Sequence, residues 1–122
     1  MSDSPIFSRT YDLILWLLPH TLKFPRSQRF VLGKVLPETL LRFQELLIEA
    51  AQSKTPLEKL KQADTQLQKL RFYLRLCRDL QLFTLGQYEY VTRLEVEVGK
   101  LLGGWLKKTE TLKVSFANKN AG

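Results

Sequence analysis

Residues 55–79 read TPLEKLKQADTQLQKLRFYLRLCRD, and this stretch decides the fold. Its apolar residues recur every three or four positions, which is the spacing of one face of an α-helix. This stripe consists of Leu57, Leu60, Ala63, Leu67, Leu70, Leu74 and Cys77, and a second row, Phe72, Tyr73 and Leu76, widens it. Thr55-Pro56-Leu57-Glu58 is typical of a capping box with proline at the first helical position. We therefore predict a helix that begins at Thr55–Pro56 and buries the stripe.

Helical spacing continues on both sides of this stretch. Residues 8–20 predict a first helix, which Pro19 should end or bend. A second helix should run from Pro25 to about Gln52, with a kink at Pro37 because proline removes a backbone hydrogen bond.

The last helix is predicted to open at a second capping box, Thr84-Leu85-Gly86-Gln87, and to end near Lys108. Four amphipathic helices joined by short links favour an all-α, up-and-down antiparallel four-helix bundle. We assign residues 1–108 to this bundle and residues 109–122 to a flexible polar C-terminal tail, because the apolar spacing weakens there.

The length and composition indicate one soluble domain. The chain has 122 residues and a net charge of +7, and no apolar run approaches the roughly 20 residues of a membrane span. No signal peptide is evident at the N-terminus, so we expect a cytoplasmic protein without a membrane partner. The positive charge favours a polyanionic partner such as nucleic acid.

The residues needed for catalysis are missing from the sequence. His20 is the only histidine and Cys77 the only cysteine, which is too few for a zinc site. The segment 99–104, GKLLGG, resembles a phosphate loop only superficially, since no strand precedes it and its lysine is misplaced. We therefore expect no catalytic residue, no metal, no cofactor and no enzymatic activity.

The positive charge gathers in two segments. Residues 59–78 carry six basic residues against Asp64, and residues 100–122 carry five lysines against Glu110. One side of this helix carries three arginines, Arg71, Arg75 and Arg78. Because like charges spaced four residues apart repel each other, this arrangement favours an anionic partner. That partner is either phosphate, which suits the guanidinium fork, or a carboxylate of the chain itself, such as Asp79, Glu95 or Glu97.

Two sets of residues are predicted to form contacts, one with nucleic acid and one at a packing or oligomer interface. We predict nucleic-acid contacts at Arg71, Arg75, Arg78, Lys100, Arg26 and Arg29. Gly99, Gly103 and Gly104 suggest a close helix contact, because each glycine in a helix costs up to about 1 kcal/mol relative to alanine. We predict a packing or oligomer interface at these glycines and at Trp105, Phe72 and Tyr73.

Two segments carry a family resemblance. Residues 70–76, LRFYLRL, and residues 95–105, EVEVGKLLGGW, resemble the accessory variability determinant (Avd) proteins of diversity-generating retroelements. The approach Phe24-Pro25-Arg26 is similar as well. The resemblance covers most of residues 10–108 and is most specific in the last two helices. The wider superfamily includes four-helix proteins encoded in intervening sequences of 23S ribosomal RNA genes.

This resemblance implies a four-helix protomer in a basic homopentameric barrel. Such a barrel binds nucleic acid, RNA or DNA, with little sequence preference and docks on an error-prone reverse transcriptase. A structural or interaction module of the ribosomal intervening-sequence type is the alternative function.

Overall fold

The structure, a computed structural model, describes residues 4–121, with side chains through Lys119. Four long helices and one short helix make up these residues, and no strand occurs among them. Their bounds are α1 (Pro5–Leu22), α2 (Arg26–Arg29), α3 (Leu32–Ala51), α4 (Leu57–Asp79) and α5 (Leu85–Ala121). The predicted all-α fold is confirmed.

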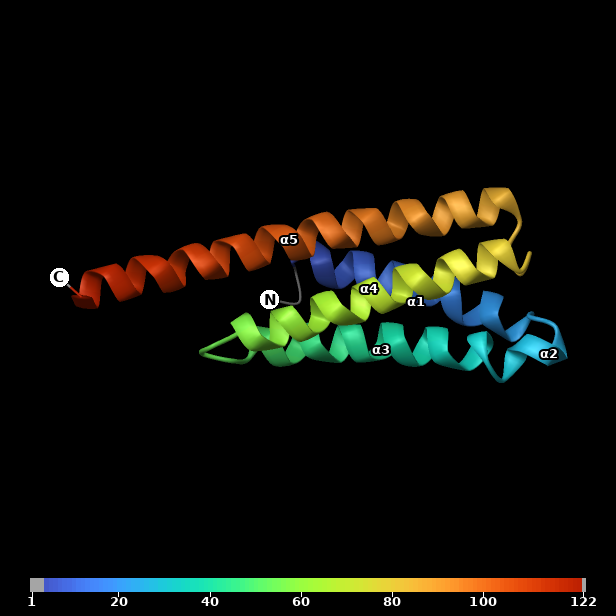
Figure 1. Ribbon diagram of the computed structural model, residues 1–122, viewed down its shortest axis with the longest axis horizontal. Helices are drawn as coiled ribbons and strands as arrows, with labels where there is room; N and C mark the ends of the chain where they lie inside the picture. Colours follow the sequence, from blue (N-terminus) through green and yellow to red (C-terminus); the bar gives the residue numbers. More distant parts are fainter. Residues whose placement is uncertain (1–3, 122) are drawn as a thin grey trace.

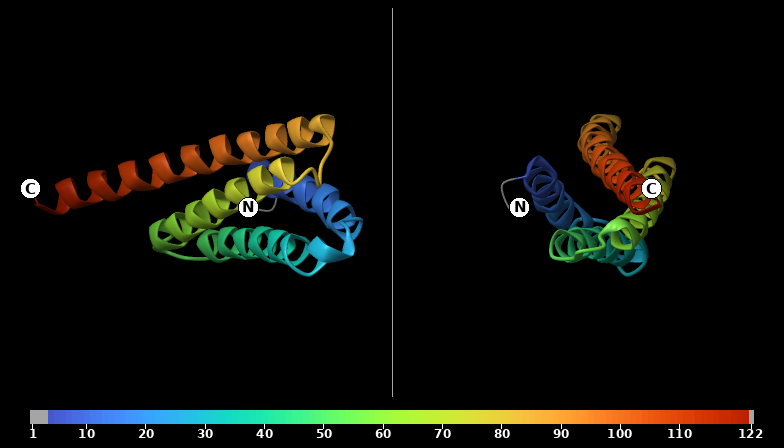
Figure 2. Two further views of the ribbon diagram at one scale, coloured as in Figure 1. Left: turned by 45° about the vertical axis from the view of Figure 1, so that its right-hand side comes forward. Right: turned by 90° about the vertical axis from the view of Figure 1, so that its left-hand side faces the viewer.

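The four long helices form an up-and-down bundle (Figure 1). Helix α1 contacts α3 and α5, and α4 contacts the same two helices, so the four close into a ring. Figure 2 shows this ring end-on in its right-hand view. Short connections join antiparallel neighbours, as the sequence predicts for such a bundle.

The predicted apolar stripe of α4 lies in the core. Leu60, Ala63, Leu67, Leu70, Leu74 and Cys77 are all buried. Helix α5 contributes Val91, Val98 and Leu102 to the core, and α3 contributes Phe43, the largest fully buried side chain. Each helix therefore buries one face against its two neighbours, which is the main source of the bundle's stability.

Two prolines lie inside helices and do not end them. The prediction that Pro19 could end the first helix is wrong, because α1 continues to Leu22. The predicted second helix is divided at Phe30 and Val31, whereas Pro37 lies within α3. Val31 has φ −111° and ψ −87°, outside the helical region, so the break falls before the proline.

Only one of the two predicted capping boxes forms. At the start of α5, Thr84 Oγ1 accepts a hydrogen bond from the Gln87 amide (3.1 Å), and Gln87 Oε1 accepts one from the Thr84 amide (2.9 Å). The prediction of a capping box at Thr55 is wrong, because Pro56 is the N-cap residue and no side chain caps α4. Ser53 Oγ instead accepts a bond from the Thr55 amide (3.0 Å).

Helix α4 ends in a left-handed residue. Gln81 has φ 60°, and its amide donates to the Arg78 carbonyl (3.0 Å) while the Leu82 amide donates to the Cys77 carbonyl (2.8 Å). This pair of bonds is the Schellman motif, whose left-handed position favours glycine.

Gln81→Gly should therefore stabilise the protein. A left-handed conformation costs a residue with a Cβ about 1 kcal/mol, and glycine avoids this cost. We expect the free energy of unfolding in urea to rise by about 0.5–1 kcal/mol, with Gln68→Gly, inside α4, lowering it by a similar amount. An unchanged or lower stability of Gln81→Gly would contradict this account of the turn.

Helix α5 extends beyond the other helices. The segment expected to be a polar tail was residues 109–122. Its described part continues the helix to Ala121, and Gly122 lies outside the described residues. In Figure 1 this end of α5 projects past the α3–α4 connection and the start of α1. Side chains 110–119 are exposed. Their flexibility in solution stays a prediction.

Candidate nucleic-acid interface

The arginine stripe of α4 is partly used within the chain. Arg71 Nε donates a hydrogen bond to Glu95 Oε1 of α5, across the contact between the two antiparallel helices. Glu95 is only 3% exposed, while about two-fifths of the Arg71 side chain remains accessible. Burial raises the pKa of Glu95, and the Arg71 guanidinium opposes that rise. Of the two anionic partners considered for Arg71, phosphate or a carboxylate of the chain itself, the structure shows the carboxylate of Glu95.

Gly99 makes room for this ion pair. A methyl group on Gly99 would lie 2.7 Å from Arg71 Nη2 and 3.5 Å from Leu67 Cδ2. The absence of a side chain at residue 99, one turn after Glu95, lets the Arg71 guanidinium lie close to the α5 backbone. The predicted close contact at Gly99 is thus a contact between α4 and α5 of one chain.

The two other arginines of the stripe differ from each other. Arg78 Nε donates to Asp79 Oδ1 (2.9 Å), and its guanidinium lies 5.2 Å from the centre of the Tyr88 ring. Arg75 is exposed and forms no ion pair with a described carboxylate. Of the three, Arg75 is the most available to an external anion.

The remaining predicted basic residues lie on α5 and α2. Lys100 is exposed on α5. Arg26 and Arg29 belong to α2, which packs against α3, and Arg29 Nε donates to the Phe24 carbonyl (3.4 Å). The predicted basic residues therefore come from three helices, α2, α4 and α5.

The residues predicted to form a packing or oligomer interface fall into two groups, some exposed and some packed within the chain. Gly103 and Gly104 are exposed, and a methyl group on either would meet no atom within 4 Å. Trp105 packs against Phe7 of α1, with ring centres 6.2 Å apart. Phe72 is 58% exposed and contacts Tyr73 edge-on, at 5.7 Å between ring centres. Of these predicted interface residues, Trp105 and Tyr73 pack against the core of the chain.

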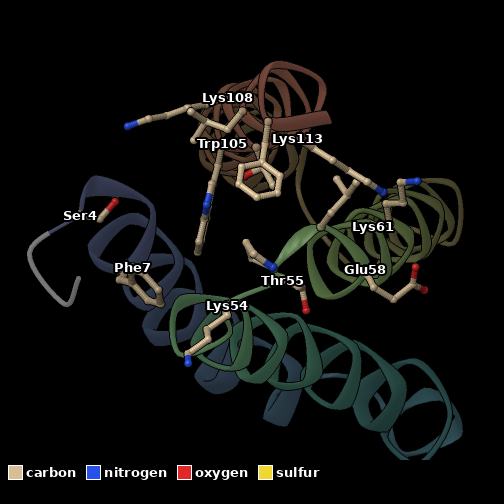
Figure 3. A pocket seen from close by; sticks show the side chains of 14 residues that line it. Ser4, Phe7, Lys54, Thr55, Glu58, Lys61, Trp105, Lys108 and Lys113 are labelled. Atoms are coloured by element: carbon tan, nitrogen blue, oxygen red, sulfur yellow. The ribbon is translucent and has the colours of Figure 1, made fainter. Parts of the chain in front are cut away.

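A groove beneath the projecting end of α5 was missed by the sequence reasoning. It has a volume of about 1050 Å³ and lies between α5, the α3–α4 connection and the N-termini of α1 and α4. Figure 3 shows Trp105 pointing from α5 into this groove. The signal was present in the sequence, because Trp105, Thr109, Leu112 and Phe116 continue the helical spacing past Lys108.

Cys77 and His20, the two side chains considered for catalysis, are both packed within the fold. Cys77 is fully buried, and desolvation raises its pKa to about 12. His20 stacks on Trp16, with ring centres 3.8 Å apart, and its Nδ1 donates to the Trp16 carbonyl (2.6 Å). In the described part of the chain, no group of three or more histidine, cysteine or acidic residues is arranged to hold a metal ion. None of the helices described is long and apolar enough to cross a bilayer.

Comparison with known proteins identifies the family. A family model described as bAvd-like matches residues 6–109, which include all four long helices except the projecting end of α5. No curated protein matches the chain. The matched residues contain the α4–α5 contact with Arg71, Glu95 and Gly99. This four-helix bundle therefore belongs to the bAvd-like family, as an Avd-type protein.

Proposed function

We propose that this chain is a non-enzymatic accessory protein of a diversity-generating retroelement. It binds nucleic acid, either template RNA or cDNA, and the error-prone reverse transcriptase, and so supports mutagenic retrohoming. Membership of the bAvd-like family supports the retroelement role. The excess of exposed positive charge, without carboxylates to neutralise it, supports the nucleic-acid role.

The ion pairs of the described residues leave most basic side chains free. Only five basic residues lie within 4.0 Å of a described carboxylate: Arg9, Arg42, Lys59, Arg71 and Arg78. Glu49 is shared by Arg42 and Lys59, and the Lys59 hydrogen bond lowers its pKa. The free cations, such as Arg75 and Lys100, are exposed and suited to phosphate contacts that carry little sequence information.

The proposal includes a homopentamer. Gly103, Gly104 and Phe72 are exposed in the single chain, so they are accessible to a neighbouring subunit. A pentamer would present each exposed basic residue, such as Arg75 and Lys100, five times. Linked weak contacts bind a long polyanion far more tightly than one contact does.

The decisive measurement is a salt titration of RNA binding. Arg75→Gln with Lys100→Gln should weaken binding to a single-stranded RNA and lower the slope of log K against log salt by about 1.4, or about 0.7 for each lost phosphate contact. Fluorescence anisotropy of a labelled RNA at several salt concentrations gives both quantities.

The matched control removes two charges that are already paired. Arg9→Gln with Arg42→Gln changes the net charge equally but breaks only exposed ion pairs, so it should affect stability and binding little. Equal effects of the two variants would indicate a response to net charge alone. An absence of RNA binding at low salt, or of co-purification with the retroelement's reverse transcriptase, would refute the proposed function.

A further inference from the structure

The core-facing stripe of α5 continues past the end of the bundle. Val98 and Leu102 are buried, and the same face then carries Trp105, Leu112 and Phe116. Leu112 is 61% exposed and Phe116 is 67% exposed, because no helix lies opposite them. Together with Phe7 of α1, these side chains give the groove an apolar floor with three aromatic rings.

Lysines surround this aromatic floor. Lys54 lies in the α3–α4 connection, Lys61 on α4, and Lys108 and Lys113 on α5, and all four line the groove. None of them forms an ion pair with a described carboxylate. Glu58 is the only acidic residue of the lining. The groove therefore suits an anion that also carries flat apolar groups.

We propose that this groove binds single-stranded nucleic acid, with bases stacked on Trp105 and Phe116 and phosphates held by the surrounding lysines. Aromatic rings combined with a positively charged groove are the usual means of binding single strands without sequence preference. Four lysines against one carboxylate in the lining suit the phosphates of a nucleic acid strand. The inference rests on the proposed function and assigns a specific site to it.

The site also extends beyond the part of the chain that the family model matches. That match ends at residue 109, whereas Leu112, Lys113 and Phe116 belong to the projecting end of α5. Figure 3 shows Lys61 and Lys113 extending from α4 and α5 around the groove. The continuation of α5 thus supplies one wall of the site.

Tryptophan fluorescence gives a direct test, because the chain has only two tryptophans. Trp16 lies about 13 Å along α1 from Phe7 and packs on His20, away from the groove. In the Trp16→Phe protein, a 20-nucleotide oligodeoxythymidylate should quench Trp105 saturably, and higher salt should reverse the quenching. A duplex of the same length should quench it less, because its bases are not free to stack.

Two further variants test the assigned contacts. Phe116→Ala removes a side chain that is exposed in the structure and should weaken oligonucleotide binding about tenfold without altering stability. Lys61→Gln with Lys113→Gln should lower the salt slope by about 1.4. Arg9→Gln with Arg42→Gln again serves as the control of equal charge.

Three results would overturn the inference and are distinguishable. If the oligonucleotide binds but both groove variants match the control, the site lies elsewhere and the proposed function survives. If oligoglutamate quenches Trp105 and the oligonucleotide does not, the occupant is an acidic protein segment. If the unmodified protein binds no oligonucleotide, the nucleic-acid part of the proposed function fails as well.

Discussion

Arg71→Ala should lower the free energy of unfolding by about 3 kcal/mol at pH 7. The substitution leaves the Glu95 carboxylate buried between α4 and α5 without its hydrogen-bonded partner. Removing one member of a buried pair costs about 3–5 kcal/mol, and the partial exposure of Arg71 places this pair at the lower end. Urea denaturation followed by circular dichroism gives the change directly.

The matched control for this substitution is Arg75→Ala. Arg75 lies one turn further along α4 but is exposed and has no described carboxylate partner, so its loss should change stability by less than about 0.5 kcal/mol. Equal effects of the two substitutions would show that the buried pair does not matter. A combined Arg71→Leu and Glu95→Leu protein should recover much of the lost stability, because apolar side chains replace buried pairs well.

The pH dependence separates loss of the charge partner from loss of packing. Without Arg71, only burial acts on Glu95, so its pKa in the folded state lies above that in the unfolded chain. The folded state then binds more protons, and stability rises as the pH falls through this raised pKa. The deficit of Arg71→Ala should therefore be smaller at pH 4 than at pH 7. A deficit that is independent of pH would indicate lost packing alone.

Phe43→Ala should cost about 4 kcal/mol of unfolding free energy. Phe43 is 1% exposed and lies in α3, which packs against both α1 and α4. Replacing a buried phenylalanine with alanine removes apolar burial and leaves a cavity, which together cost about 3–5 kcal/mol. Thermal and urea denaturation of the purified variant measure the loss.

Phe72→Ala is the control with the same chemical change. Its ring is 58% exposed on the outer side of α4, so the single chain should lose less than about 1 kcal/mol. If Phe43→Ala does not fold, Phe43→Leu keeps most of the volume and should still cost about 1 kcal/mol. Similar losses at residues 43 and 72 would contradict the described core.

The sequence by itself determined the class of fold and the approximate positions of the four long helices. Apolar spacing is a local property, so the stripe from Leu60 to Cys77 was enough to predict which face of α4 is buried. The capping box at Thr84 was also predictable, because its two hydrogen bonds join residues three apart. Local signals did not predict the helix ends at Thr55 and Pro19. A Thr-Pro-x-Glu sequence does not always form a capping box, and a proline does not always end a helix.

Only the tertiary structure decided which charges are free and what the end of α5 does. The sequence left Arg71 with several possible anions, because a contact with Glu95, 24 residues away, depends on the register of two antiparallel helices. The role of Gly99 follows from that same register. The groove likewise required the lengths of α1, α3 and α4 as well as that of α5, since its walls come from segments far apart in the chain. Spacing along one helix predicts which face is apolar, whereas the packing of the bundle determines whether another helix covers it.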